Sequence, residues 1–344
     1  MGYNNMFYIR VDANTEIATG HVIRCLTIAD EIQRRGREIV FITADHCADE
    51  LIHSRGFESI CLNSKWNDLS SEIPIIIKLI KSRKISEILI DSYFVTYKYL
   101  QWLCQYIKVI YLDDLGKINY PIDVLVNYNI YAHEISYKKL IGFNNTKFLL
   151  GEKYTPLRRE FYNIQRSYRD SLKAVLISTG GADKYNIAEN IIKNILKESY
   201  FSNIQFYVIS GSLNHNRLSL VELSRQNRNI HICENISIIS ELMCRCDTAI
   251  SACGTTMYEL CACGLPVITF SFADNQIPGA NGFAKKMLAF NCGDYRYDTK
   301  KTIYNIKNNL KKLIYNSSLR KEMYENARKL VDGKGAIRIV DEIM

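Results

Sequence analysis

The sequence has no apolar run that reaches the roughly 18 residues needed for a membrane-spanning helix. The N-terminus runs straight into a strand-like segment, Phe7–Val11, so we expect no targeting segment. Fibrous repeats and low-complexity tracts are absent as well. We therefore expect a folded, soluble, cytoplasmic protein with no stable insertion into a membrane.

The cysteines lack the spacing of a metal-binding knuckle. There are 11 of them, and the two close pairs, Cys244 with Cys246 and Cys261 with Cys263, are each separated by a single residue. A zinc knuckle has two residues between its ligands and needs a matching second pair. This pattern is typical of reduced thiols in a cytoplasm, and we expect neither a metal nor a cofactor.

No dense cluster of basic residues with interleaved aromatics occurs, which argues against a nucleic-acid partner. The chain has 44 Lys and Arg against 36 Asp and Glu, a formal charge of +8, with much of the excess between Lys300 and Lys334. Such a stretch is usually a solvated helix face. A modest positive field also suits an anionic substrate such as a nucleotide diphosphate, so both interpretations stay open.

Short apolar runs alternate with helix-length amphipathic segments along the 344 residues, which predicts an α/β protein with parallel sheets. The first series of predicted strands is Phe7–Val11, Ile39–Thr43, Glu87–Ile90, Val109–Leu112 and Val124–Asn127. The second is Ala174–Ser178, Gln205–Ile209, Asn229–Ile232, Thr248–Ser251 and Pro266–Phe270.

The polar, aromatic stretch around residues 151–171 separates the two series. We expect a Rossmann-like domain over residues 1–155, a linker over 156–170 and a second Rossmann-like domain over 171–344. The last of these includes C-terminal helices with an apolar stripe at Leu310, Leu313 and Ile314. In such folds ligands bind beyond the carboxyl ends of the strands, so we expect a ligand cleft between the domains.

The richest motif lies at the end of the first predicted strand. Arg10 and Asp12 close that strand, a polar loop follows, and Gly20-His21 opens a helix that carries Arg24 one turn later. Charged groups at the end of a buried strand need partners or a function. Arg24 lies on the same helix face as His21, where it can meet a phosphate or hold a carboxylate.

His21 is the candidate general base. The positive end of the helix dipole disfavours an imidazolium in the first turn, so we expect a neutral ring near pH 7. A neutral imidazole can take a proton from water. In the alternative interpretation, His21 only caps the helix and Asp12 pairs with Arg10 structurally.

Two motifs of the second half are typical of nucleotide binding. Gly180-Gly181 and Asp183 follow a buried strand, where paired glycines and a helix N-terminus with free N–H groups can approach a phosphate. Gly254-Thr255-Thr256 opens another predicted helix. Glu259 lies one turn into that helix, where a carboxylate can take both hydroxyls of a ribose. Beyond the next strand, Asn275 and Gln276 offer amide donors.

These motifs resemble known families. Glu259, five residues before Gly264-Leu-Pro266, is similar to the nucleotide-sugar signature of GT-B glycosyltransferases, including the MurG type. The N-terminal motif resembles the PseG family, the UDP-2,4-diacetamido-2,4,6-trideoxy-β-L-altropyranose hydrolases, and their spore-coat-polysaccharide relatives. The further matches are Asp91-Ser-Tyr93, Asp113-Asp114, Asn127-x-Asn129-x-Tyr131-Ala132, Leu157-Arg158-x-Glu160-Phe161 and Gly180-Gly181-x-Asp183. All the matches together span roughly residues 7–276.

The resemblance implies a GT-B fold and a role for each matching residue. His21 is the implied general base. The implied substrate-binding residues are Arg10, Asp12, Gly20, Arg24, Tyr93, Asn127, Asn129 and Arg158. The implied UDP-binding residues are Gly180, Gly181, Asp183, Gly254, Thr255, Thr256, Glu259, Asn275 and Gln276. Two features depart from the family: Ser92 stands where a His is frequent, and the chain after Gln276 is longer.

The predicted activity is therefore hydrolysis of a UDP-linked 2,4-diacetamido-2,4,6-trideoxy hexose in pseudaminic-acid-type sugar synthesis. Its partners are the UDP-sugar and water, and the sequence identifies no protein partner. A GT-B glycosyltransferase with a UDP-sugar donor is the first alternative. A hydrolysing 2-epimerase is chemically closer to the predicted hydrolase, because it also liberates UDP. A catalytically silent nucleotide-sugar-binding regulator is a third alternative, from a different class.

Overall fold

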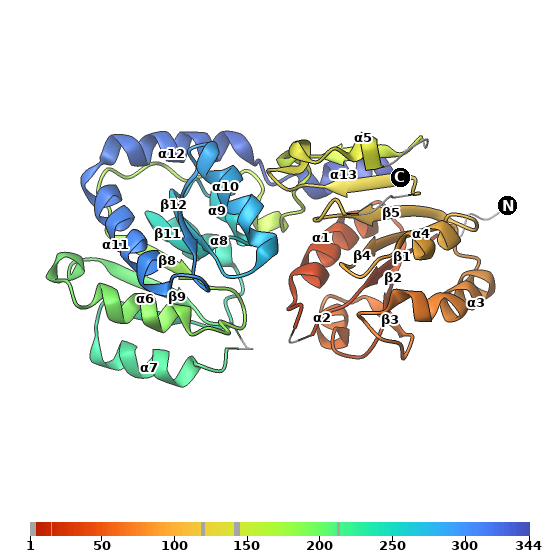
Figure 1. Ribbon diagram of the computed structural model, residues 1–344, viewed down its shortest axis with the longest axis horizontal. Coiled ribbons are helices and arrows are strands. Elements are labelled where there is room, and N and C mark those ends of the chain that lie inside the picture. Colours follow the sequence, from red (N-terminus) through yellow and green to blue (C-terminus); the bar gives the residue numbers. More distant parts are fainter. Residues whose placement is uncertain (1–4, 15, 118–120, 141–144, 212–213) are drawn as a thin grey trace. The chain divides into compact units, whose positions relative to one another are not determined.

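The computed structural model describes residues 5–14, 16–117, 121–140, 145–211 and 214–344. The chain forms two compact units, which we call unit 1 and unit 2. Unit 1 comprises Met1–Leu157 with Lys334–Met344, and unit 2 comprises Arg158–Gly333. Each unit is built on one sheet whose strands pair in parallel, as the alternation of strands and helices predicted (Figure 1).

The sheet of unit 1 has seven strands in the order β3-β2-β1-β4-β5-β6-β7. They are β1 (Met6–Val11), β2 (Glu38–Thr43), β3 (Glu58–Cys61), β4 (Glu87–Asp91), β5 (Lys108–Leu112), β6 (Val124–Asn127) and β7 (Lys147–Leu150). Its helices are α1 (Gly20–Arg34), α2 (Asp49–Ser54), α3 (Ile73–Arg83), α4 (Tyr97–Leu103), α5 (Tyr137–Leu140) and α13 (Gly335–Ile343). The apolar face of α1 is buried as predicted, at Val22, Leu26, Ala29 and Ile32.

The sheet of unit 2 has six strands in the order β10-β9-β8-β11-β12-β13. They are β8 (Ala174–Ser178), β9 (Gln205–Ile209), β10 (Ile230–Cys233), β11 (Thr248–Ala252), β12 (Val267–Ser271) and β13 (Ala289–Asp294). Its helices are α6 (Ile187–Ile195), α7 (Arg217–Gln226), α8 (Ile239–Arg245), α9 (Thr256–Ala262), α10 (Ile277–Lys285), α11 (Thr299–Tyr315) and α12 (Ser317–Leu330).

Three strands were missed by the sequence analysis: β3, β7 and β13. All three lie at the edge of their sheet. An edge strand is only partly covered, so its sequence does not need the continuous apolar run of a central strand. Polar positions in β13, such as Asn291 and Asp294, illustrate this.

The predicted domain limits need two corrections. The last helix, α13, was assigned to the second domain but packs on α1 of unit 1, where Ala336, Ile339 and Val340 are buried. The segment predicted as a linker belongs largely to unit 2, because Arg166 donates hydrogen bonds to backbone carbonyls of that unit. Amphipathic periodicity shows that a helix buries one face, but not which sheet it covers.

Both sheets reverse their strand order at one point, between β1 and β4 in unit 1 and between β8 and β11 in unit 2. In open α/β sheets, ligands bind beyond the carboxyl ends of strands at such a switch point. The loop after β1 leads to His21, and the loops after β8 and β11 carry the glycine motifs. Within the described residues, every helix is too short or too polar to span a bilayer.

Candidate functional site

His21 lies in the first turn of α1, beyond the carboxyl end of β1, and is almost fully buried. Its Nδ1 is 2.6 Å from Oδ1 of Asp91, the last residue of β4. The side chain does not cap α1. Among the described residues, its Nε2 has no hydrogen-bond partner. With Nδ1–H donated to the carboxylate, Nε2 carries the lone pair that can accept a proton.

Arg24 and His21 keep the carboxyl group of Asp91 ionised. Burial alone would raise the pKa of this carboxyl, but Arg24 and His21 overcome that effect and hold the pKa well below its usual range. The Arg24 guanidinium donates from Nε to Oδ2 and from Nη2 to Oδ1, both at 2.6 Å. This bidentate geometry fixes the carboxylate plane, and with it the orientation of the His21 ring.

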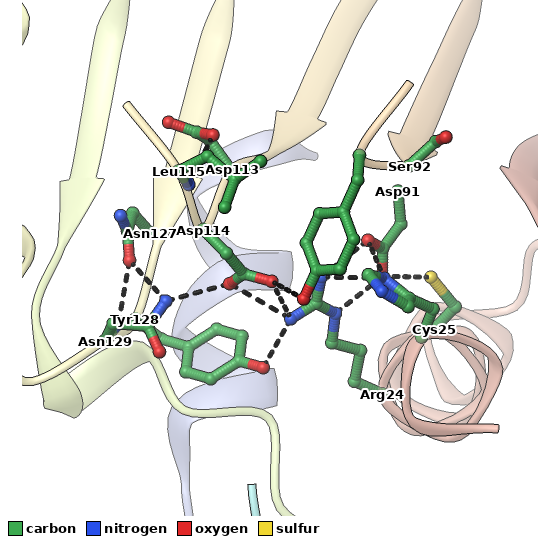
Figure 2. A network of polar contacts seen from close by, with 12 residues as sticks. Arg24, Cys25, Asp91, Ser92, Asp113, Asp114, Leu115, Asn127, Tyr128 and Asn129 are labelled. Atoms are coloured by element: carbon green, nitrogen blue, oxygen red, sulfur yellow. Dashed lines mark hydrogen bonds and ion pairs between the residues drawn. The ribbon is translucent and has the colours of Figure 1, made fainter. Parts of the chain in front are cut away.

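Arg24 also bridges to a second carboxylate (Figure 2). Its Nη1 lies 2.9 Å from Oδ2 of Asp114 and 2.6 Å from the hydroxyl of Tyr128. The sequence left open whether Arg24 meets a phosphate or a carboxylate, and the structure places two carboxylates around it. One guanidinium therefore faces two negative charges. The cluster of Arg24, Asp91 and Asp114 thus carries a net charge of −1.

Asp114 positions the polar groups that surround His21. Tyr93, half-buried after β4, donates its hydroxyl to Oδ2 of Asp114 at 3.2 Å, and its ring meets the His21 ring edge-on at 4.5 Å. Asn129 donates to Oδ1 of Asp114 at 2.8 Å and to Oδ1 of Asn127 at 2.9 Å. The predicted residues His21, Arg24, Tyr93, Asn127 and Asn129 thus belong to one polar network.

Arg10 and Asp12, predicted to bind substrate, belong to a separate buried cluster. Arg10 is fully buried and donates to Glu72 at 2.9 and 2.8 Å and to Asp12 at 2.6 Å. Asp12 also accepts the backbone N–H of Ala44 at 2.7 Å. These contacts match the alternative in which the pair is structural. Gly20 is exposed at the start of α1, where an added Cβ would meet no atom within 4 Å.

The predicted phosphate site after β8 needs a correction. Asp183 is buried, and its two carboxylate oxygens accept the N–H groups of Ile187 at 2.8 Å and Ala188 at 3.1 Å. These are the first N–H groups of α6. They are therefore not available to a phosphate, contrary to the expectation from the sequence. Gly180 has a φ of +88°, which accounts for a glycine at that position. The motif therefore includes a helix cap, a role that the sequence analysis did not assign to Asp183.

The start of α9 differs from that of α6. Gly254 and Thr255 are exposed, Thr256 is half-buried, and no side chain caps this helix. Glu259, in the first turn, accepts a hydrogen bond from Arg158 Nη2 at 3.0 Å. Burial raises the pKa of Glu259 above its usual value, although Arg158 opposes the shift. The carboxylate has acceptor capacity beyond this one contact.

The last two predicted residues lie in the loop after β12. Asn275 is exposed. Gln276 uses its side-chain carbonyl to accept the backbone N–H of Phe272 at 2.9 Å, which leaves its amide N–H groups as the part suited to a ligand. The loops after β8 and β12 approach each other, because Tyr185 and Phe272 pack edge-to-face at 6.1 Å.

Sequence reasoning gave no role to Asp91, Asp114 or Tyr128, although it quoted the first two as family matches. The sequence contains a signal for Asp91, because its carboxylate directly follows the apolar run Ile88–Ile90. Like Arg10 and Asp12 after β1, a charged group at the end of a buried strand needs a partner or a function. For Tyr128, no sequence signal separates it from the many other tyrosines.

No family model matches the sequence. The chain is 29% identical over 292 residues to the protein MJ1062 of Methanocaldococcus jannaschii, covering 81% of this chain and 58% of that relative. It is 22% identical over 337 residues to the spore coat polysaccharide biosynthesis protein SpsG of Bacillus subtilis, covering 96% and 95%. It is 27% identical over 280 residues to the UDP-2,4-diacetamido-2,4,6-trideoxy-β-L-altropyranose hydrolase of Campylobacter jejuni, covering 80% and 95%.

The fold is similar to that of solved GT-B proteins. MurG of Acinetobacter baumannii superposes with a TM-score of 0.70 at 13% identity, over 98% of both chains. The S. aureus MnaA–UDP structure superposes with a TM-score of 0.68 at 11% identity, over 98% of this chain and 95% of that one. The chain spans little more than half of MJ1062, but nearly all of SpsG and of the hydrolase. The chain is thus similar in sequence to SpsG and to the hydrolase, and its fold is of the GT-B type.

Proposed function

We propose that the chain hydrolyses a UDP-linked 2,4-diacetamido-2,4,6-trideoxy hexose and releases UDP, with His21 as the general base. The observation that carries the proposal is the Asp91-bound imidazole of His21, whose Nε2 is left to accept a proton. The relative from Campylobacter jejuni, named for this hydrolysis, supports the choice of substrate class. UDP is an expected ligand, in keeping with the name of the MnaA–UDP structure.

In the proposed reaction, His21 Nε2 takes a proton from water while the water oxygen attacks the anomeric carbon. The bond from that carbon to the diphosphate oxygen breaks, and UDP leaves with the electron pair. In-line displacement inverts the anomeric centre. Asp91 stabilises the imidazolium as it forms, because the Nδ1–H already points at the carboxylate.

The nucleotide is assigned to unit 2. The uncapped start of α9 offers backbone N–H groups to the diphosphate, and Glu259 offers a carboxylate to the ribose hydroxyls. Gly180 and Gly181 bring the backbone close to the nucleotide, with Asp183 supporting that loop as the cap of α6. Arg158 positions Glu259 through the contact at 3.0 Å.

The substrate test is incubation with a panel of UDP- and GDP-linked diacetamido sugars, followed by NMR of the anomeric protons. We expect UDP and a free sugar of inverted configuration, with no acceptor added. UDP release that requires an added sugar or lipid acceptor would identify a glycosyltransferase instead. A product sugar with an inverted C2 centre would identify a hydrolysing 2-epimerase.

The catalytic test is His21→Ala. We expect kcat to fall by about 10²–10⁴-fold, the usual contribution of a general base, with UDP affinity unchanged. His46→Ala is the matched control, because His46 also pairs with an aspartate, Asp49, at 2.6 Å but is exposed on the surface. Near-normal turnover of His21→Ala would remove this residue from the mechanism.

A further inference from the structure

The loop after β8 contacts the loop after β9, and we call them the glycine loop (residues 180–183) and the β9 loop (residues 210–216). In the sheet of unit 2, β9 pairs with β8 on the side away from β11 (Figure 1). The switch point of the strand order, where open α/β sheets bind their ligands, lies on the other side of β8. A contact from the β9 loop therefore reaches the glycine loop from the side opposite the proposed nucleotide site.

Gly211 of the β9 loop approaches the backbone of Gly181 closely. An ideal Cβ placed on Gly211 would lie 2.4 Å from the carbonyl oxygen of Gly181 and 2.8 Å from its Cα. Both distances are shorter than any normal contact, and backbone atoms cannot turn aside as the end of a flexible side chain can. The φ of Gly211 is not positive. The close approach of Gly181, and not a left-handed backbone, therefore requires a glycine here.

Gly181 itself is open where its own side chain would project. A Cβ on Gly181 would meet no atom of the described residues within 4 Å, and the residue is exposed. Gly180, with a φ of +88°, turns the chain just before it. The backbone of Gly181 is thus supported by Gly211 while this face stays accessible. A glycine with an accessible face allows close approach of the backbone to a ligand.

Asn216 makes a second link between the two loops. Its Nδ2 donates a hydrogen bond to the backbone carbonyl of Asp183 at 3.2 Å. The side chain of Asp183 caps α6 through Ile187 and Ala188, so this residue is held both by its carboxylate and by its carbonyl. Asp183 has a φ of +40°, a left-handed conformation that costs a non-glycine residue free energy and needs contacts to hold it.

The β9 loop has internal hydrogen bonds of its own. Asn214 is buried, and its Nδ2 donates to Oγ of Ser210 at 3.3 Å. Its Oδ1 accepts the backbone N–H of Asn216 at 2.8 Å, and its backbone N–H donates to the carbonyl of Gly211 at 3.1 Å. The N–H of Ser210 donates to the carbonyl of Cys233, the last residue of β10, at 3.0 Å. The loop is therefore anchored to the sheet independently of the glycine loop.

We propose that Gly211 and Asn216 are positioning residues for a nucleoside diphosphate. Through the backbone contact and the amide hydrogen bond, they hold the glycine loop where its backbone can approach the diphosphate. The inference rests on the proposed function, because that function assigns the nucleotide to this loop. Both residues act through the loop, so they govern nucleotide affinity and leave the chemical step unchanged.

The first test is isothermal titration calorimetry of UDP with Asn216→Ala and its matched control Asn229→Ala. Asn229 makes the same kind of bond, from Nδ2 to the carbonyl of Ile204 at 3.0 Å, but it lies at the amino ends of β9 and β10. Loss of one neutral hydrogen bond corresponds to about 2–10-fold in an equilibrium constant. We expect the Kd for UDP to rise by about that factor in N216A and to stay unchanged in N229A. Urea denaturation should show similar losses of stability in both.

The second variant is Gly211→Ala, which forces the backbone of Gly181 to move. Misplacement of a binding group by about 1 Å can cost about 10²-fold. We expect the Kd for UDP to rise by about 10–100-fold, with kcat at saturating UDP-sugar unchanged. A residue that only stabilised the fold would not separate affinity from turnover in this way. If circular dichroism shows that G211A is unfolded, N216A decides the question.

Hydrogen exchange without nucleotide tests the support of the loop itself. Peptides that cover residues 179–187 should exchange faster in N216A than in wild type or N229A, because the loop opens more easily. Unchanged exchange and an unchanged Kd for UDP in N216A would overturn the inference while leaving the proposed function intact. A fall in kcat without a rise in Kd would overturn it as well. If the wild type bound no UDP, the proposed function would fail, and nucleotide positioning with it.

Discussion

Asp91 in unit 1 is a buried carboxylate and Glu259 in unit 2 is a largely buried one, and each contacts an arginine. The net shifts of their pKa values have opposite signs. Asp91 receives two hydrogen bonds from Arg24 and one from His21, and these hold its pKa well below the usual range despite burial. Glu259 receives one hydrogen bond from Arg158, and burial prevails and raises its pKa.

The different pKa shifts indicate that Asp91 has its full set of charged partners within the fold, whereas Glu259 does not. The charges of Asp91 and Arg24 are paired within the fold, so the imidazole of His21, our proposed base, is oriented before any ligand arrives. Glu259 shares Arg158 with Glu160, which lies 2.9 Å from the same guanidinium. Its carboxylate thus gains from further donors, such as the hydroxyls of a ribose. We infer that unit 1 is preorganised for chemistry and unit 2 for binding.

The largest effect is expected from Asp91→Asn, which removes the charge that pairs with Arg24 and His21. Breaking a buried ion pair typically lowers the free energy of unfolding by about 3–5 kcal/mol, and urea denaturation measures it. The amide can also donate to Nδ1 and so favour the wrong tautomer of His21. We therefore expect kcat to fall by about 10²–10⁴-fold.

Asp49→Asn is the matched control, because it breaks the exposed histidine–aspartate pair at His46. We expect a change in unfolding free energy below about 1 kcal/mol and normal turnover.

Because the pKa of Asp91 is lowered, the stabilisation that its carboxylate contributes is present above the ordinary aspartate range. This stabilisation is lost as pH falls through the folded-state pKa. If D91N and wild type had equal stability at neutral pH, Asp91 would not be the anchor of the cluster.

The next effect is expected at the proposed nucleotide site of unit 2. Glu259→Gln removes a charged acceptor, and hydrogen bonds to charged groups contribute about 1.5–3 kcal/mol. We expect the Kd for UDP to rise by about 10–100-fold in isothermal titration calorimetry, with kcat at saturating substrate nearly unchanged. Glu189→Gln is the control, because Glu189 lies in the first turn of the capped helix α6. Unchanged UDP affinity in E259Q would separate Glu259 from the nucleotide.

The sequence predicted the fold and singled out His21 as a candidate, because both leave local signals. Continuous apolar runs showed the inner strands, and His21 follows a strand end that carries charges. Pairing partners were not predictable. Asp91 lies 70 residues from His21 and 67 from Arg24, and Asp114 lies 90 from Arg24, so only the strand order brings them together. Likewise, nothing in the sequence distinguishes Asp183 as a helix cap from Asp183 as a ligand.

A smaller effect is expected from Asp183→Ala, which removes the cap of α6. Loss of such a cap costs about 0.5–2 kcal/mol of stability, measurable by urea denaturation. Asp183→Asn keeps an acceptor oxygen and should recover most of the loss. UDP affinity should change less in either variant than in E259Q, because the carboxylate of Asp183 is already occupied by Ile187 and Ala188. A larger loss of affinity than in E259Q would restore Asp183 as a direct ligand.

The smallest effect concerns how the contributions of Asp91 and Glu259 to the free energy of unfolding change with pH. Burial raises the pKa of Glu259, so its contribution to stability is full below the ordinary glutamate range and is lost as pH rises through the folded-state pKa. The stability of wild type relative to E259Q should therefore fall between acidic and neutral pH. Relative to D91N it should rise over the acidic range, because the pKa of Asp91 is lowered. Urea denaturation at several pH values measures both slopes, and slopes of the same sign would show that the two carboxylates do not differ as the structure indicates.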